Sequence, residues 1–263
     1  MDPFFQHGWI QFPSDPHILK WVQAAAPAAQ ATFQDPTLRA QWLRCGGTWF
    51  AGVNALPNDS TGAIPAASVP SLSGAVIDYI STALGLNDVA WDRAQVSICL
   101  PGYPQPWDGE TDAAFRFRRD RDAAHLDGLL RDENRRRRPG EQHGFILGLP
   151  LTDAAPDAAP FVVYEGSHHV MRQALSERLA DVPPEQWADE DVTDAYTAAR
   201  RKVFETCKRV KIHARPGEAY LAHRLAIHGV APWTAGPEGQ RTIAYFRPDP
   251  HPDQPPEWWL QAP

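Results

Sequence analysis

From residue 94 onward, apolar residues recur in short runs whose spacing suits β-strands. In AQVSICL (94–100), Val96, Ile98 and Leu100 alternate with polar or small residues, the two-residue period of a half-buried strand. Similar runs follow at GFILGLPL (144–151), FVVY (161–164), RVKIHA (209–214), EAYLAH (218–223) and RTIAYF (241–246). They are bounded by Gly, Pro and Asp and are rarely separated by helical patterns, which disfavours a parallel βαβ sheet. We therefore expect a sandwich or a barrel.

The first 90 residues or so show a mixed, largely helical pattern. DPHILKWVQAAAPAAQATF (15–33) predicts an alanine-rich helix interrupted at Pro27, and DPTLRAQWLRC (35–45) predicts a shorter helix. TWFAGVNALP (48–57) is a strand candidate. SLSGAVIDYISTALGL (71–86) carries apolar residues at helical spacing, with Ser71 or Ser73 as its expected N-cap.

No internal repeat and no low-complexity linker divides the chain. We expect one domain over residues 1–263, with a mixed N-terminal part at about 1–90 and a β core at about 94–247. A long helical stretch from about 169 to 206 is expected as an insertion between two strands of that core.

The composition excludes several classes of function. A net charge of −7 and a pI of about 5.8 give little support to nucleic-acid binding. No apolar run of about 18 residues and no secretory leader pattern is visible, so we expect no membrane segment and a cytoplasmic location. Cys45, Cys99 and Cys207 are widely spaced without a CxxC pair and are expected to be reduced thiols. Walker, GxSxG and GxGxxG motifs are missing, which argues against nucleotide and serine-hydrolase chemistry.

A candidate metal site is formed by His125 and Asp127, with His228 as the third ligand. In an extended segment, the two residues of a His-x-Asp pair point to the same side. Two histidines and one carboxylate make the facial triad of non-haem Fe(II) enzymes, which leaves positions free for a 2-oxo acid and O2. The pair alone is also compatible with a solvated surface, and His223 is the nearest rival to His228 as third ligand.

Arg241 begins the strand candidate RTIAYF, thirteen residues after His228 (241 − 228). It shares one strand face with Ile243 and Tyr245, so we expect it to point into the core. An inward cation needs an anionic partner, and the distal carboxylate of 2-oxoglutarate would supply one. If Arg241 does not bind that co-substrate, Arg224 or Arg247 is the next candidate.

These motifs resemble the phytanoyl-CoA dioxygenase-like branch of the Fe(II)/2-oxoglutarate-dependent oxygenases. The resemblance rests on the order His-x-Asp, His-Gly and Arg, on FVVYEGSHHVM (161–171) and on the opening FFQHGWIQFP (4–13). It implies a mainly β fold with flanking helices (α+β), namely a cupin-like double-stranded β-helix or jelly roll. By the same resemblance His125, Asp127 and His228 hold iron and Arg241 holds 2-oxoglutarate. Glu165 stands where the family's PGSH-type turn has proline.

The expected activity is therefore hydroxylation of a small molecule, with Fe(II), 2-oxoglutarate and O2. Asp127 favours hydroxylation over halogenation, because Gly or Ala at that position would open a site for halide. The alternatives are a cupin-like metal enzyme without 2-oxoglutarate and a non-catalytic jelly-roll binding protein. Neither the prime substrate nor the oligomeric state follows from the sequence.

The segments FRFRRDRD (115–122) and RDENRRRR (131–138) flank the proposed metal pair. Such charge runs are most often solvated. The alternative interpretation is a mobile cationic rim over the site that captures an anionic substrate. It requires that these segments lie near the metal and that their arginines are not paired with neighbouring acids.

Overall fold

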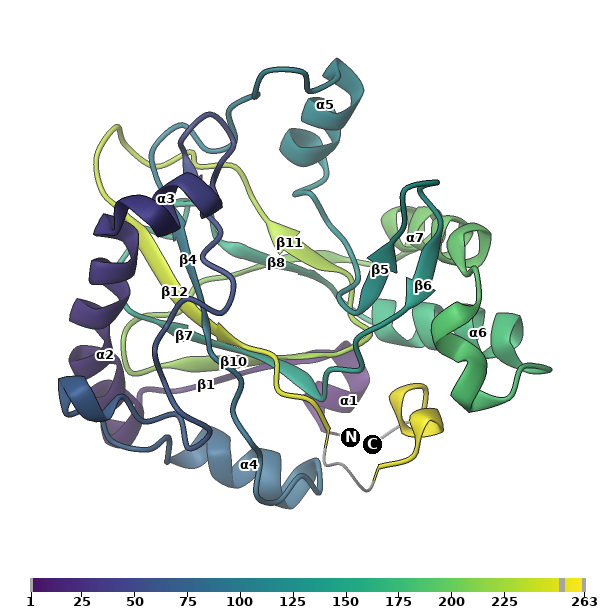
Figure 1. Ribbon diagram of the computed structural model, residues 1–263, viewed down its shortest axis with the longest axis horizontal. Helices are drawn as coiled ribbons and strands as arrows, with labels where there is room; N and C mark the ends of the chain where they lie inside the picture. The colour runs from purple at the N-terminus through teal and green to yellow at the C-terminus, as the bar shows by residue number, and fades with distance from the viewer. Residues whose placement is uncertain (1, 251–253, 262–263) are drawn as a thin grey trace.

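Two antiparallel sheets face each other and carry the core (Figure 1). The computed structural model describes residues 2–250 and 254–261. The larger sheet has the strand order β1 (Trp9–Phe12), β10 (Ala219–His223), β7 (Phe145–Pro150), β12 (Arg241–Phe246), β4 (Gln95–Cys99), β3 (Trp49–Phe50) and β2 (Leu43–Arg44). The smaller sheet has the order β11 (His228–Val230), β8 (Phe161–Tyr164) and β9 (Arg209–Ile212). A separate hairpin joins β5 (Leu129–Arg131) to β6 (Arg137–Pro139).

Alternation along each strand divides its residues between two layers. In β8, Phe161 and Val163 pack between the sheets, whereas Val162 and Tyr164 pack against the helices outside. In β12, Ile243 and Tyr245 face the other sheet. The layer between the sheets comprises Ile146, Phe161, Val163, Ile212, Tyr220, Ala222, Ala226, Ile243 and Tyr245. Two facing antiparallel sheets with helices outside confirm the jelly-roll prediction.

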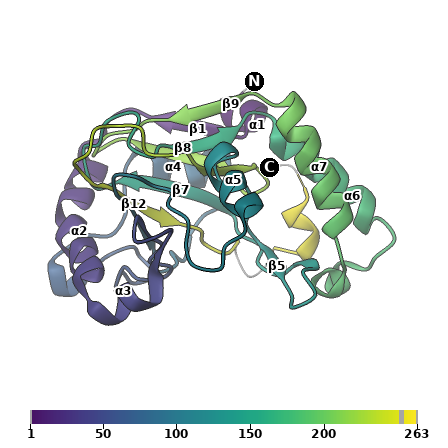
Figure 2. The ribbon, with the colours of Figure 1, turned by 90° about the horizontal axis from the view of Figure 1, so that it is seen from above.

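Helices cover the outer faces of both sheets (Figures 1 and 2). The helices are α1 (Pro3–His7), α2 (Pro16–Gln34), α3 (Pro36–Trp42), α4 (Ala75–Ala83), α5 (Asp112–Asp120), α6 (Ser167–Leu179) and α7 (Thr193–Thr206), with 3-10 turns η1 (Pro65–Ala67), η2 (Pro184–Asp189) and η3 (Pro256–Trp259). The pair α6 and α7 lies between β8 and β9, within the stretch where the sequence predicted helix. Among the described residues, no helix combines the length and hydrophobicity needed to cross a membrane.

Helix α2 continues through Pro27, contrary to the predicted interruption. Proline removes the hydrogen bond to the carbonyl four residues earlier, here that of Gln23. Both Pro27 and Gln23 are exposed, so water can serve that carbonyl. The opposite face of the helix buries Trp21 and Val22, and that packing outweighs the lost bond.

The cap of α4 comes from a distant residue and not from Ser71 or Ser73. One Asp15 oxygen accepts from the Ala75 amide at 2.9 Å, while the other accepts from the His17 amide at 2.7 Å. One carboxylate therefore caps both α2 and α4. The amide hydrogen bonds at the starts of both helices lower the pKa of Asp15, with that to Ala75 contributing most.

Two strand predictions also need correction. The predicted strand at 48–57 is limited to Trp49–Phe50, because Gly52 has φ +43° and a Cβ there would lie 2.4 Å from the Val96 carbonyl oxygen. Strand β4 is buried along its whole length and not half-buried. Its polar face, with Gln95 and Ser97, faces an internal cavity instead of bulk solvent.

Candidate metal centre

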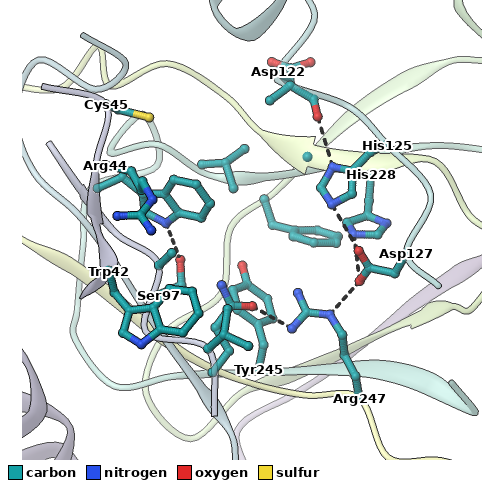
Figure 3. Close-up of a pocket in the computed structure, with 18 of the residues that line it drawn as sticks. Trp42, Arg44, Cys45, Ser97, Asp122, His125, Asp127, His228, Tyr245 and Arg247 are labelled. Carbon is teal, nitrogen blue, oxygen red and sulfur yellow. Dashed lines mark hydrogen bonds and ion pairs between the residues drawn. The ribbon is translucent and has the colours of Figure 1, made fainter. Parts of the chain in front are cut away.

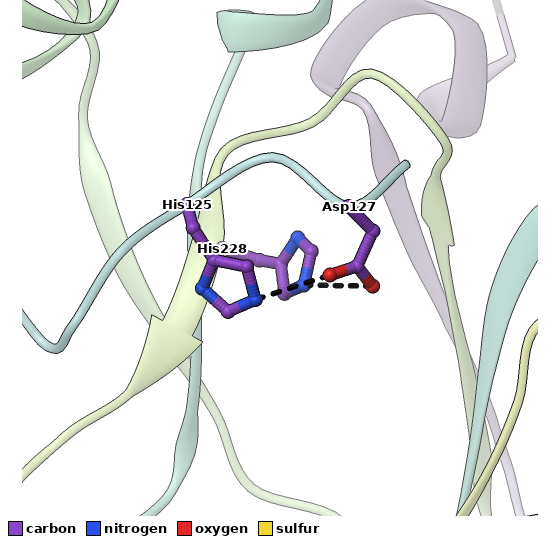
Figure 4. Close-up of side chains that lie close together, drawn as sticks. All are labelled: His125, Asp127 and His228. Atoms are coloured by element: carbon purple, nitrogen blue, oxygen red, sulfur yellow. Dashed lines mark ion pairs between the residues drawn. The ribbon is translucent and has the colours of Figure 1, made fainter. Parts of the chain in front are cut away.

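Three side chains from distant parts of the chain meet at one end of the smaller sheet (Figure 4). His125, Asp127 and His228 each offer a donor atom, and these atoms all lie within 4.8 Å of one another. The His125 and His228 backbones exchange two hydrogen bonds, of 2.9 and 3.0 Å. This bridge attaches the His-x-Asp loop to β11 and brings together two histidines that are 103 positions apart in the sequence (228 − 125).

Backbone carbonyls orient both imidazoles. Nδ1 of His125 lies 3.0 Å from the Ala123 oxygen, and Nδ1 of His228 lies 2.9 Å from the Ala226 oxygen. Each Nδ1 can donate to its carbonyl, which leaves the Nε2 lone pair directed at Asp127. The Nε2 atom of His228 is buried and has no hydrogen-bond partner, although an Asp127 oxygen lies 3.4 Å away. A bound metal ion would supply the partner that this buried nitrogen lacks.

The glycine after His228 allows the close approach of the two segments. A Cβ at Gly229 would lie 2.2 Å from the Asp122 carbonyl oxygen. The turn at Gly166 supports the same strand, since Ser167 accepts a hydrogen bond from the Ile227 amide at 2.9 Å. Ser167 is the first residue of α6 and not its N-cap, which is Gly166. The GSH-type turn therefore fixes the backbone next to His228.

Glu165, the residue that departs from the family's turn, has its own contacts. Its carboxylate accepts from the Trp9 indole nitrogen at 3.1 Å and lies 3.5 Å from the Lys208 ammonium. It therefore joins the N-terminal motif 4–13 to the turn, and it takes no part in the metal cluster.

Arg247 is the residue of this site that the sequence analysis named only as a fallback. Its Nε donates to Asp127 Oδ2 at 2.6 Å, and its Nη1 donates to the Gln95 amide oxygen at 2.6 Å. Burial alone would raise the pKa of Asp127, but the Arg247 guanidinium, His228 and His125 hold it well below its usual range. Period-two spacing from Tyr245 was the signal that could have placed Arg247 in the site.

The two histidines have pKa values shifted in opposite directions. Burial lowers the pKa of His228 and outweighs the attraction of Asp127. Desolvation also disfavours protonation of His125, although its side chain is 47% exposed, but the hydrogen bond and the charge of Asp127 prevail and the pKa is raised. His228 is therefore neutral and ready to bind a cation at pH 7, whereas a proton competes more strongly for His125.

The cluster opens into a cavity of about 690 Å³ between the sheets and the loops at this end (Figure 3). This volume lies in the range typical of sites for small molecules. Polar or charged side chains on its floor include Gln95, Ser97, Tyr245 and Arg247. Its other wall is largely aromatic.

Arg241 is buried, and it lies on the inner face of β12 as expected. Its guanidinium donates to the Tyr245 hydroxyl at 2.7 Å, and that hydroxyl also accepts from Tyr220 at 2.9 Å. Tyr245 lines the large cavity, whereas Arg241 lines a small neighbouring cavity with Tyr220. Among the described residues no carboxylate pairs with Arg241.

The remaining basic candidates lie apart from the cluster. His223 is fully buried, and its Nε2 lies 3.1 Å from an Arg172 nitrogen. His168 bonds the Phe5 carbonyl and packs against His169 and His223, a structural role. Arg224 donates to the carbonyls of Trp258, Trp259 and Gln261 and so holds the C-terminal turn against the body. Residues 251–253 and 262–263 near the end of the chain lie outside the described residues.

The mobile cationic rim is wrong for segment 131–138. This segment forms the β5–β6 hairpin, where Arg136 pairs with Asp132 and Arg137 stacks on Tyr196 of α7. In segment 115–122, Arg118 lines the cavity but pairs with Glu110. The other arginines of the two segments do not line the cavity. The direction of an arginine side chain in these segments depends on the acidic residues near it more than on the number of arginines.

No protein-family model and no curated protein sequence matches the chain. Solved structures do match. The chain is similar to the non-heme alpha-ketoglutarate-dependent carbocyclase SnoK from nogalamycin biosynthesis, with a TM-score of 0.51 and 13% identity over 94% of this chain and 81% of that one. It is also similar to AviO1 from Streptomyces viridochromogenes Tue57, with a TM-score of 0.50 and 17% identity over 99% of this chain and 95% of that one. The chain shares their fold. At these identities the likeness establishes the architecture alone.

Proposed function

We propose that this protein is an Fe(II)- and 2-oxoglutarate-dependent dioxygenase that hydroxylates a small molecule. The observation that carries the proposal is the cluster of His125, Asp127 and His228 on the wall of a large cavity, with the buried Nε2 of His228 lacking a hydrogen-bond partner. The fold is one on which alpha-ketoglutarate-dependent chemistry occurs, as in SnoK.

The donor set fits iron. Two imidazole nitrogens and one carboxylate suit Fe(II), and no thiol belongs to the cluster, as a structural zinc site would more often require. When bound, the iron would couple the oxidative decarboxylation of 2-oxoglutarate to succinate and CO2 with hydroxylation of a C–H bond. The backbone carbonyls at Ala123 and Ala226 hold the imidazoles, and Arg247 restrains the carboxylate of Asp127.

Arg241 is the residue that we assign to the distal carboxylate of 2-oxoglutarate. It is a buried cation whose polar contacts are the Tyr245 hydroxyl and the Cys99 sulfur. A carboxylate would replace these neutral contacts with a charge-assisted bidentate pair. Tyr245 lines the large cavity together with the metal cluster and also accepts a hydrogen bond from Arg241. Its hydroxyl therefore lies between the large cavity and the Arg241 guanidinium.

A metal enzyme that uses no 2-oxo acid is the second candidate. The position of Arg241 favours it, because Arg241 lines the small neighbouring cavity and does not line the large one. Arg247, which does line the cavity, is already paired with Asp127. The two candidates differ in whether 2-oxoglutarate is consumed.

The proposal predicts Fe(II)- and O2-dependent turnover. The protein with Fe(II), O2 and uniformly 13C-labelled 2-oxoglutarate is expected to form labelled succinate. A metabolite extract added to the reaction should then contain a product heavier by one oxygen atom. Omission of Fe(II) and the His125→Ala variant are the controls, and neither should form succinate above background. Modification of a metabolite without succinate would favour the second candidate.

A further inference from the structure

Three tryptophans and one arginine line the cavity, namely Trp42, Trp49, Trp107 and Arg44, here called the aromatic wall. Figure 3 shows Trp42 and Arg44 across the cavity from His228 and Asp127. Trp107 is 45% exposed, and Val53 beside this wall is 42% exposed. They are two of the three large hydrophobic residues exposed in the described part of the chain, and both line this cavity. Apolar surface gathered at a cavity mouth points to a ligand that covers it.

The tryptophans come from three separate elements. Trp42 ends α3, Trp49 lies in β3, and Trp107 lies in the loop before α5. The Trp49 indole is fixed by its donation to Ser97 Oγ at 3.1 Å, and the Arg118 guanidinium lies 4.1 Å from the Trp107 ring centre. Flat rings held in this way favour stacking with another flat ring, which a saturated ligand body cannot reproduce.

Arg44 supplies the charge of the aromatic wall. Its side chain is exposed and donates to the carbonyl of its neighbour Leu43 at 3.1 Å. The other two arginines that line the cavity each have a carboxylate partner: Arg118 pairs with Glu110 and Arg247 with Asp127. Within residues 2–250 and 254–261 Arg44 has none at ion-pair distance. Arg44 is therefore the cavity-lining arginine without an ionic partner in the described residues, and it belongs to the same wall as the tryptophans.

We infer that the prime substrate is a flat aromatic compound with a carboxylate or similar anionic group, which pairs with Arg44 while its rings stack on the aromatic wall. This arrangement places the far edge of the ring system toward His125, Asp127 and His228. The inference about binding stands on the cavity alone, whereas the reaction at that edge rests on the proposed function.

The test uses three probes of the same carbon skeleton and calorimetry on the full-length protein without added iron or 2-oxoglutarate. The probes are 2-naphthoate, the neutral 2-naphthamide and the saturated decahydro-2-naphthoate. We expect 2-naphthoate to bind at least about tenfold more tightly than either analogue, since the amide lacks the charge-assisted pair and the saturated acid lacks the stacking surface. Arg44→Ala should remove the preference for naphthoate over naphthamide. Arg131→Ala, which removes an exposed arginine outside the cavity, should leave it unchanged.

Trp107→Ala provides a second variant that alters the wall and not its charge. It should weaken both aromatic probes several-fold and the saturated acid less, since the saturated acid loses apolar contact but no stacking. The inference is overturned if wild-type protein does not bind 2-naphthoate, if it binds all three probes equally, or if Arg44→Ala keeps the charge preference. The experiment measures binding and not turnover. A protein without oxygenase activity could therefore still show the predicted binding preference. Conversely, normal succinate formation would not support the inference if the binding experiment failed.

Discussion

His228→Ala should lose tight binding of a divalent metal, with an affinity lower by more than about a hundredfold. Removing a group that merely supports a metal ligand costs about 10- to 100-fold, so removing a ligand costs more. His223, the rival third ligand named from the sequence, lies in a different buried cluster and cannot take the place of His228. Equilibrium dialysis with metal analysis measures the effect. Wild type should hold one metal ion per chain.

Two further variants make the result interpretable. His228 is buried, so its replacement can disturb packing, whereas the His125 side chain is 47% exposed and His125→Ala should lose metal without loss of fold. His17→Ala changes an exposed histidine of α2 and should bind metal as wild type does. Affinity should also rise with pH through the raised pKa of His125, because its proton must leave before Nε2 can bind. Full metal occupancy in both His228→Ala and His125→Ala would disprove the ligand assignment.

Arg241→Ala should weaken binding of 2-oxoglutarate by about a hundredfold or more while metal binding persists. A hydrogen bond to a charged group contributes about 1.5–3 kcal/mol, and a bidentate pair contains two such bonds. Arg241→Lys should fall between wild type and Arg241→Ala, since an ammonium lacks the two parallel donors. Calorimetric titration of 2-oxoglutarate into the Ni(II)-loaded protein gives the affinities. Shorter 2-oxo acids without a distal carboxylate should bind the alanine variant almost as well as 2-oxoglutarate does.

Arg247→Gln is the matched comparison for that experiment. It removes the guanidinium beside Asp127, so it should alter metal binding as well as 2-oxoglutarate binding. If Arg241→Ala binds 2-oxoglutarate as tightly as wild type and Arg247→Gln does not, the co-substrate assignment moves to Arg247.

The parts of the fold that were predictable depend on local periodicity. FVVY and RTIAYF are apolar runs, and β8 and β12 coincide with them, with successive side chains on alternate faces of the sheet. The inward direction of the Arg241 side chain was predictable because Arg241 shares one strand face with Ile243 and Tyr245. The gathering of His125, Asp127 and His228 was predictable only from motif order, because nothing local connects residues 103 positions apart (228 − 125).

The parts that were missed depend on contacts between distant residues. Asp15 caps α4 across 60 positions of sequence, so the serines beside that helix were a misleading signal. The packing of Trp21 and Val22 keeps α2 continuous through Pro27. Glu110 and Asp132 pair with Arg118 and Arg136, and a count of charges cannot reveal such pairing.

The central claim is that one metal site takes 2-oxoglutarate as a ligand, and absorption spectroscopy of the anaerobic Fe(II) protein tests it most directly. We expect addition of 2-oxoglutarate to produce a metal-to-ligand charge-transfer band that saturates at one equivalent per chain. The band should be missing without iron and in His125→Ala. A protein that binds one Fe(II) per chain and yet develops no band with saturating 2-oxoglutarate would contradict the claim and leave a metal enzyme that uses no 2-oxo acid.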